Sequence, residues 1–222
     1  VGGEKTTMSP GDFVITPSWV WHDHGNESDG PMVWLDGLDM HIVNMFDASF
    51  MENYSQMRHE LTRPEGSAYS MVGHNLLPVD WDKKSKTSPI FNYPYKVTRD
   101  TLDQMSRSND PDSCHGYKMR YINPLTGGPA MPTLTTTMQL LPKGFTTSAF
   151  RCTGSTVYVG VEGRGTATVG DRQFDWEPND IIAVPSWVPV IFSATNECVL
   201  FSYSDRAVLE ALDLYREQRG NV

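Results

Sequence analysis

The chain has 222 residues, of which 39% are hydrophobic and 20% are charged, a balance typical of a folded globular protein. Its formal net charge of −9 disfavours nucleic acid and anionic membranes as partners, because both would repel most of the surface. No apolar run approaches the roughly 20 residues that cross a bilayer. The 3 widely spaced cysteines form no CxxC pair, which favours a reducing compartment such as the cytoplasm.

The N-terminal part is expected to form strands followed by a helix. The segments "DFVITPSWVW" and "PMVWLDGLDMHIVNMF" are rich in aromatic and β-branched residues, which predicts strands between residues 10 and 45. In residues 47–62 apolar side chains recur at steps of three and four, which predicts a helix with Asp47 as its N-cap.

The rest of the chain is expected to be loop-rich first and then almost continuously β. Residues 63–97 and 109–132 have few regular signals, and a short helix capped by Thr98 lies between them. Residues 133–203 contain short apolar runs separated by turn residues, which favours an antiparallel sandwich or barrel. An amphipathic helix capped by Ser204 is predicted at 204–218. The predicted fold class is all-β with a few helices.

An internal repeat relates the two ends of the chain. Residues 2–20 align without a gap on residues 170–188, at an offset of 168, and both copies end in Pro-Ser-Trp-Val. Beyond the repeat, His22 matches Val190 and His24 matches Phe192. We therefore expect two copies of one fold, of which the first carries the chemistry and the second is structural.

The half of the second copy that precedes residue 170 has no counterpart in the first copy. Subtracting the offset places that counterpart before residue 1. The first barrel is therefore expected to be truncated at its N-terminus, with a natural chain longer by at least about 35 residues.

The repeat also contains a recognisable motif. The stretch "PGDFVITPSWVWHDHGN" fits the second cupin motif G-x5-P-x-G-x2-H-x3-N through Gly11, Pro17, His22 and Asn26, with Trp19 in place of the usual glycine. Together with "VWLDGLD", "FDASF" and "SPIFNYPY", it resembles the gentisate 1,2-dioxygenase family along essentially the whole chain. That family includes the related salicylate and 1-hydroxy-2-naphthoate ring-cleaving dioxygenases.

The resemblance implies a bicupin fold, a homotetramer and Fe(II) held by three histidines in the first cupin. It implies cleavage of a hydroxylated aromatic acid by O2, between the carboxyl-bearing and hydroxyl-bearing ring carbons. The metal ligand that carries over is His22, whereas the other two belong to the H-x-H of the first cupin motif. This sequence does not contain that motif, and its one H-x-H is formed by His22 and His24 themselves. In the second barrel the ligand positions of the pattern hold other residues, among them Cys152 and Val190, so that barrel is expected to be metal-free.

These observations predict a division into three parts. Residues 1–46 are the C-terminal half of the first, metal-binding cupin, and residues 47–132 are a helical and loop connection. Residues 133–222 are the second, metal-free cupin with the C-terminal helix.

Two further residues are candidates for contact with substrate. On the alternation of a strand, His24 points the same way as His22, so it is expected to bind the substrate or to handle a proton. Asp36 lies in an apolar strand, where a buried carboxylate needs a partner, and it is expected to orient a histidine or contact a ring hydroxyl. Asp23 is expected to anchor a loop and Asp39 to be structural.

The remaining histidines and tryptophans are expected to have ordinary roles. His41, His59, His74 and His115 share no spacing and are expected on the surface or in loops. The tryptophans near the motif, Trp19, Trp21 and Trp34, are more often core residues than site residues.

Two other functions fit the sequence. A metal-free cupin used for binding or assembly is one, since the second copy already lacks the ligand pattern. A cupin isomerase with zinc or manganese is the other, although the aromatic flank of the histidines disfavours a sugar phosphate. The residues do not separate gentisate, salicylate and a naphthoate as substrates.

Overall fold

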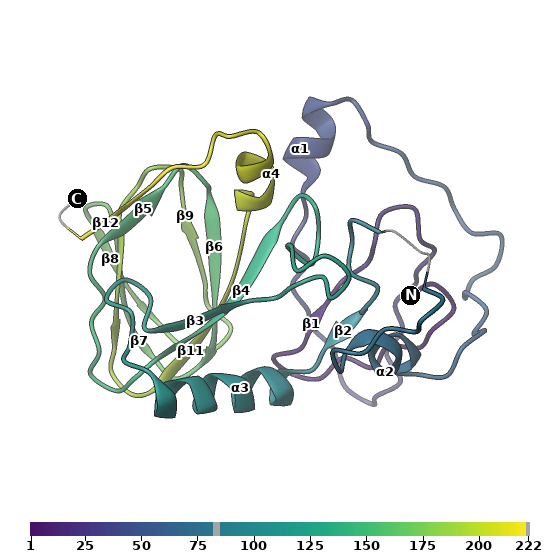
Figure 1. Cartoon of the computed structure of the whole chain (residues 1–222), viewed down its shortest axis with the longest axis horizontal. Helices are drawn as coiled ribbons and strands as arrows, with labels where there is room; N and C mark the ends of the chain where they lie inside the picture. The colour runs from purple at the N-terminus through teal and green to yellow at the C-terminus, as the bar shows by residue number, and fades with distance from the viewer. Residues whose placement is uncertain (82–84, 221–222) are drawn as a thin grey trace.

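The computed structural model describes residues 1–81 and 85–220. Figure 1 shows two lobes, a β-barrel formed by the second half of the chain and a more irregular lobe formed by the first. The irregular lobe contains the two-stranded sheet β1 (Phe13–Val14) with β2 (Asn92–Tyr93) and the helices α1 (Met40–Met45) and α2 (Ser67–Val72). Helix α3 (Tyr95–Ser108) runs from this lobe along the barrel.

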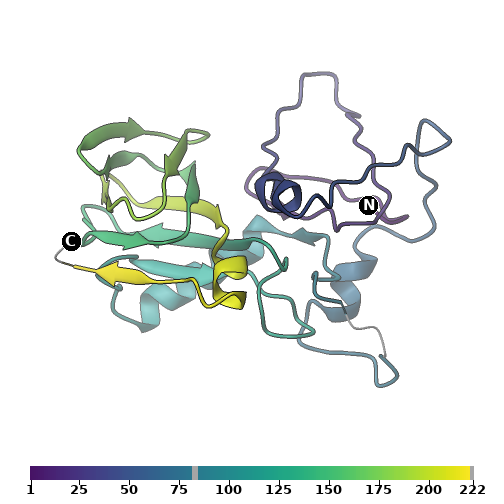
Figure 2. The same ribbon diagram turned by 90° about the horizontal axis from the view of Figure 1, so that it is seen from above.

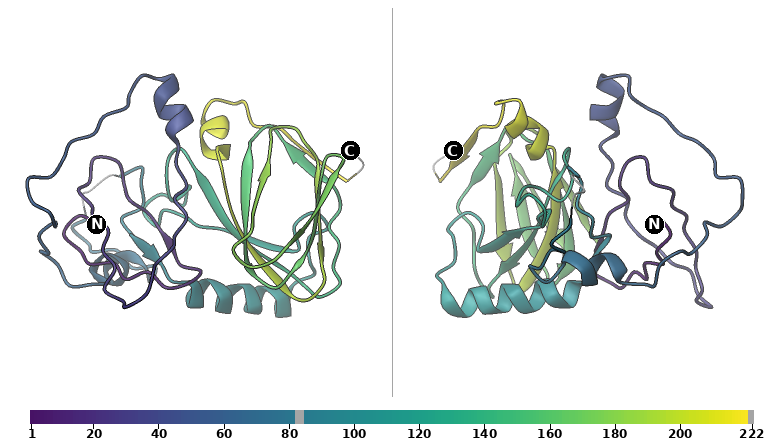
Figure 3. Two further views of the ribbon diagram at one scale, coloured as in Figure 1. Left: turned by 180° about the vertical axis from the view of Figure 1, so that it is seen from behind. Right: turned by 45° about the vertical axis from the view of Figure 1, so that its right-hand side comes forward.

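The barrel consists of two five-stranded antiparallel sheets, as the short strands of the sequence predict. One has the order β12-β5-β10-β7-β8 and the other β3-β4-β11-β6-β9. The views in Figures 2 and 3 show the sheets facing each other around an enclosed interior. The strands are β3 (Tyr117–Arg120), β4 (Thr135–Leu141), β5 (Phe150–Cys152), β6 (Thr156–Glu162), β7 (Gly165–Val169), β8 (Arg172–Trp176), β9 (Ile181–Val184), β10 (Val190–Ala194), β11 (Cys198–Ser204) and β12 (Glu217–Arg219).

Two hydrophobic cores stabilise the barrel. The first fills its interior with side chains from both sheets, among them Trp176, Phe192 and Leu200. The second lies outside it, where α3 covers the other face of β3-β4-β11-β6-β9 through Leu102. Burying each side chain of this size contributes roughly 1.5–3 kcal/mol. Helix α3 begins at Tyr95, after Pro94, and therefore earlier than the predicted cap Thr98.

The repeat seen in the sequence is also a repeat of backbone geometry. Trp19 and Trp187, which are equivalent, both adopt left-handed backbone angles, with φ of 64° and 62°. In each copy the equivalent glycine donates to a carbonyl after the Pro-Ser-Trp turn, at 2.8 Å from Gly2 N to Trp21 O and at 2.8 Å from Gly170 N to Pro189 O. Because a non-glycine residue rarely adopts positive φ, the shared tryptophan conformation confirms the repeat independently of residue identity.

The strands predicted between residues 10 and 45 are mostly wrong. Only Phe13–Val14 form a strand there, and residues 40–45 form helix α1. Val33 and Leu38 are 92% and 64% exposed and lie outside any strand. A strand needs a continuous neighbouring backbone for its hydrogen bonds, and in the described residues a ladder forms there only between Phe13–Val14 and β2.

The helix predicted at 47–62 is also wrong. Asp47 has φ of 50° and ends α1 in place of capping a new helix, and Ala48 N donates to Val43 O at 3.0 Å. The apolar side chains of that pattern have no core to pack against, and Met57 is 97% exposed. Short helices depend on such packing for their stability.

The C-terminal prediction is right only for its first part. Helix α4 (Arg206–Ala211) is N-capped by Asp205, not by Ser204, and ends before Asp213, whose φ is 56°. The chain then extends as β12, which pairs with β5 at the barrel edge. Backbone pairing to an open sheet edge replaces the last turns of the predicted helix.

Among the described residues, no helix has the length and apolar character needed to span a membrane. The three cysteines are free, with Cys114 and Cys198 buried and Cys152 half-buried.

Candidate functional site

His22 follows directly from the repeated scaffold, three residues after the left-handed Trp19. Its side chain is exposed, and its Nδ1 lies 3.3 Å from the carbonyl oxygen of Val20. When Nδ1 carries the proton and donates to this carbonyl, the lone pair of Nε2 is free. A metal-binding histidine commonly has this arrangement, with one ring nitrogen fixed by backbone and the other directed at the metal.

His24 lies beside His22, although the segment is not a strand. The two imidazole centroids are 5.6 Å apart with the rings at 64°, and the other neighbour of His24 is Trp34 at 5.1 Å. The pair therefore forms a small group of two imidazoles and one indole. Trp34 is 45% exposed, so it is not a core residue as the sequence suggested.

Asp23 has the loop-anchoring role that the sequence predicts. Its Oδ2 accepts a hydrogen bond of 2.9 Å from the backbone N–H of His59, across 36 residues of chain. This bond ties the histidine segment to the irregular stretch after α1. One oxygen of the carboxylate is therefore engaged by backbone.

The prediction that Asp36 is buried is wrong, because its side chain is exposed. Its neighbours fix the segment to the barrel. A Cβ on Gly37 would lie 3.3 Å from the ring of Tyr203, so the glycine permits close packing on β11. Asp39 accepts a 2.5 Å hydrogen bond from Thr133, which confirms its structural role. Thr133 and Tyr203 carry no motif signal that would identify them from sequence.

The second barrel has apolar side chains at the positions equivalent to the two histidines. Val190 and Phe192 are 4% and 2% exposed, and both belong to the interior core. Positions 22 and 24 therefore correspond to two interior-facing positions of a complete barrel. This correspondence supports a shared orientation of His22 and His24.

His22 fits a metal site in the chemistry and availability of its donor atom, but the described residues hold only part of one. No group of three histidine, cysteine or carboxylate side chains lies close enough to bind a metal ion within residues 1–81 and 85–220. An imidazole with free Nε2 suits a divalent transition metal. The chain thus offers one candidate ligand, His22, and a second imidazole nearby.

The chain is similar to known proteins over nearly its whole length. A family model described as "Cupin domain" matches residues 1–38. The chain is 52% identical over 220 residues to gentisate 1,2 dioxygenase 1 of Aquipseudomonas alcaligenes, an alignment that covers 99% of this chain and 63% of that protein. The chain is a homologue of the gentisate 1,2-dioxygenases.

Other proteins similar to this chain are named for related aromatic acids. It is 35% identical to a 5-aminosalicylate 1,2-dioxygenase of a Comamonas species, over 98% of this chain and 58% of that protein. The structure of salicylate 1,2-dioxygenase of Pseudoaminobacter salicylatoxidans with gentisate superposes with a TM-score of 0.90, at 32% identity, over 97% of this chain and 61% of that one. The predicted resemblance and the mostly-β cupin fold are confirmed.

This homologue spans about three fifths of the length of the relatives it matches, between 57% and 63%. The predicted upstream extension stays a prediction.

Proposed function

We propose that the protein is an Fe(II)-dependent ring-cleaving dioxygenase that acts on a hydroxylated aromatic acid of the gentisate or salicylate class with O2. The observation that carries the proposal is His22 in a chain 52% identical to a gentisate dioxygenase. Its Nδ1 lies 3.3 Å from Val20 O, and its Nε2 has no hydrogen-bond partner in the described part of the chain. When bound, the iron would supply a redox-active centre that allows a singlet aromatic acid to react with triplet O2.

The residues of the chain have distinct roles in this proposal. His22 holds the metal through Nε2. His24, 5.6 Å away and in contact with Trp34, hydrogen-bonds the ring hydroxyl and takes up or returns its proton. Asp36 contacts the substrate from the segment that Gly37 seats against Tyr203. The indole of Trp34 limits water beside His24, which strengthens the hydrogen bonds of that imidazole.

The wider organisation follows from the same family. We propose that residues 1–46 belong to the metal-binding cupin, that 47–132 connect, and that 133–222 form the metal-free cupin. Strand β3 precedes this last range but pairs with β4 of the barrel. We further propose a homotetramer in the cytoplasm, where the free cysteines remain reduced.

The experiment that tests the proposed function compares three forms of the whole protein, loaded anaerobically with Fe(II). His22→Ala is expected to lose bound iron by elemental analysis and to lose O2 uptake with gentisate. His24→Gln is expected to keep iron and to lower kcat by about 10²-fold or more. The control, His74→Ala, replaces an exposed histidine in the turn that follows α2, and it should keep both the bound iron and the O2 uptake.

Full iron occupancy in His22→Ala would refute its role as ligand. A wild-type protein that binds no iron would favour the metal-free binding or assembly module. Iron-independent sugar isomerisation with zinc or manganese would favour the isomerase.

A further inference from the structure

The stretch after α1, residues 48–62, lies beside the segment that carries the two histidines. It contacts three alternate residues of that segment, two through aromatic rings and one through a backbone hydrogen bond: Trp19 with Phe50 at 5.0 Å, Trp21 with Tyr54 at 5.1 Å, and Asp23 with His59 at 2.9 Å. The alternating residues His22 and His24 contact each other instead. Because alternate side chains of an extended chain point to opposite sides, one side of the segment faces residues 48–62 and the other carries the imidazoles.

Tyr54 links the two residues that flank His22. Its ring meets Trp21 with the planes at 61°, and it also meets the imidazole of His59 at 5.0 Å. The backbone N–H of His59 donates to Asp23 Oδ2. These contacts therefore connect the residue immediately before His22 to the residue immediately after it. We call Trp21, Asp23, Tyr54 and His59 the Tyr54 clamp.

Burial within residues 48–62 is confined to the clamp. Tyr54 and His59 are half-buried, whereas every other residue of this stretch is exposed. The stretch is fixed at both ends by backbone hydrogen bonds, from Ala48 N to the last turn of α1 and from Thr62 N to Gly3 O at 2.8 Å. The side chains that face the histidine segment are therefore the ones that hold the stretch in place between its ends.

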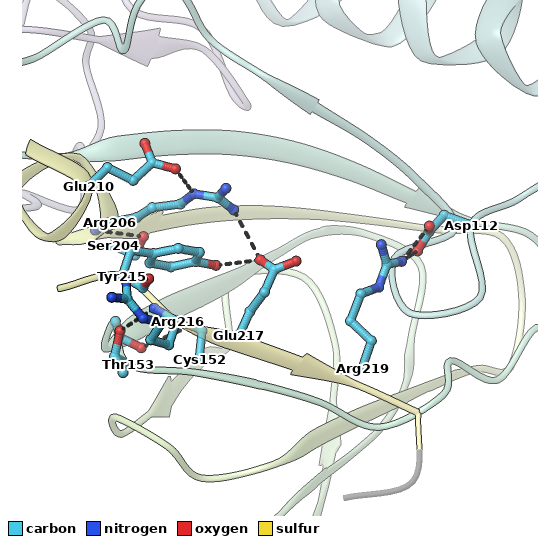
Figure 4. Close-up of polar contacts among 11 residues, drawn as sticks. Asp112, Cys152, Thr153, Ser204, Arg206, Glu210, Tyr215, Arg216, Glu217 and Arg219 are labelled. Carbon is cyan, nitrogen blue, oxygen red and sulfur yellow. Dashed lines mark hydrogen bonds and ion pairs between the residues drawn. The ribbon is translucent and has the colours of Figure 1, made fainter. Parts of the chain in front are cut away.

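The second copy has an equivalent stretch that is held differently. Helices α1 and α4 end alike, before Asp47 and Asp213, whose φ angles are 50° and 56°. After α4, the chain pairs with β5 as β12, and Figure 4 shows the Tyr215 hydroxyl donating to Glu217 at 2.8 Å. Strand pairing and polar contacts thus hold this stretch in the apolar barrel, whereas aromatic rings hold its equivalent against the histidine segment.

The direction of a metal-binding imidazole depends on the backbone that carries it. Nδ1 of His22 lies 3.3 Å from Val20 O, so movement of the chain beside His22 would also turn its Nε2. Contacts that orient a ligand without touching the metal change metal affinity by about 10–100-fold. The ring contacts of Tyr54 are with Trp21 and His59, so its effect on His22 passes through the neighbouring backbone.

We propose that Tyr54 is a positioning residue of the metal site. Its ring holds Trp21 and His59, and through them the backbone on both sides of His22, so that Nε2 is directed at the metal. The proposal rests on the metal-binding role of His22 in the proposed function. It adds to that function a residue that lies outside the cupin motif.

Fe(II) affinity of the whole protein, measured anaerobically by competition with a chromogenic chelator, tests the proposal without turnover. Tyr54→Ala is expected to raise the dissociation constant about 10-fold or more. Tyr54→Phe keeps the ring and should bind as wild type does. Tyr69→Ala is a matched control, because Tyr69 is also half-buried and also contacts one histidine ring, that of His74 at 5.1 Å. It should leave the affinity unchanged.

Two uncharged variants of Asp23 test the other side of the clamp. Asp23→Asn keeps an acceptor for the N–H of His59, and Asp23→Leu removes it, so the two differ in the hydrogen bond and not in charge. Asp23→Leu should bind Fe(II) about 10-fold more weakly than Asp23→Asn. Adding Tyr54→Ala to Asp23→Leu should cause little further loss, because both act through one set of contacts.

Hydrogen exchange of wild type keeps the test independent of whether the variants fold. By linkage, a set of contacts that strengthens Fe(II) binding is itself strengthened by bound Fe(II), by the same factor. The amide of His59, which donates to Asp23, should therefore exchange more slowly when Fe(II) is bound. The amide of Arg216 donates to Thr153 Oγ1 at 3.0 Å in the second barrel, and its exchange should not change.

An Fe(II) affinity of Tyr54→Ala equal to that of wild type would overturn the proposal. So would a His59 amide whose exchange is the same with and without Fe(II). A wild type that binds Fe(II) without O2 uptake would refute the dioxygenase function alone, because the affinities still decide the role of Tyr54. A wild type that binds no Fe(II) would refute both.

Discussion

His115 makes a sharp test of the electrostatics inside the barrel. It lies in the turn before β3, with its ring centroid 4.6 Å from that of Phe150. Burial, and then the positive charge of Lys118, lower its pKa to about 3. The negative charge of Asp112 opposes this shift, while the positive charges of Arg219 and Arg206 add to it. His115 is therefore neutral in the folded protein well below the pH at which a free histidine gains its proton.

The difference between the folded and unfolded pKa of His115 sets how the free energy of unfolding changes with pH. The unfolded chain takes up a proton on His115 below about pH 6.5, whereas the folded protein does so only near pH 3. Stability therefore rises with pH across this window and is lost as the pH falls. Between pH 7 and pH 5, this one residue lowers the free energy of unfolding by about 2 kcal/mol.

Urea unfolding at pH 7 and pH 5 measures this loss for wild type and for His115→Gln, which cannot titrate. Other groups titrate in both proteins, so they cancel in the difference. The variant should lose about 2 kcal/mol less than wild type over this pH interval. The control His74→Gln, at an exposed position, should follow wild type. Equal losses in wild type and His115→Gln would refute the reasoning.

Two further predictions use matched pairs of positions. Leu102→Ala, at a fully buried position of α3, should lower the free energy of unfolding by about 2–5 kcal/mol in urea, whereas Val97→Ala at a 48% exposed position should cost much less. Gly163 and Gly144 both have positive φ, at 76° and 75°, but only a Cβ on Gly163 would meet a backbone oxygen, at 2.3 Å from Glu197. Gly163→Ala should therefore unfold at lower urea than Gly144→Ala, and equal midpoints would contradict the packing argument.

The sequence predicts the barrel well because its signals there are redundant. Short apolar runs, turn residues and the repeat at residues 170–188 all indicate the same antiparallel strands. The repeat also predicts that Val190 and Phe192 occupy positions equivalent to His22 and His24, and both prove to be interior. Agreement among independent local signals makes a fold predictable from one chain.

The same reasoning fails where structure depends on a neighbour. Residues 47–62 have the apolar period of a helix, but Met57 has no surface to pack against. Asp36 lies in an apolar run, which predicts burial, yet its side chain is exposed because no neighbouring element of the described chain covers it. The sequence pattern of a segment indicates which of its faces is apolar. Whether another element packs against that face depends on the tertiary structure.

The position of Lys118 on the interior face of β3 is not predictable from sequence. Lys118 lies in a stretch that looks like a loop, and its closest partners, Gln139 and Tyr158, come from strands 20 or more residues away in the chain. A lysine without a motif is most often a solvated side chain. Only the register of β3 on β4 brings its ammonium to the interior.

The most direct test of the central claim is O2 uptake by the whole protein after anaerobic loading with Fe(II). Gentisate, salicylate and 1-hydroxy-2-naphthoate are supplied in turn, and O2 consumption is followed together with loss of the aromatic absorbance. The proposed function predicts uptake of one O2 per ring opened with at least one of these acids, and loss of that uptake in His22→Ala. No uptake with any of the three acids, at full iron occupancy, would contradict it.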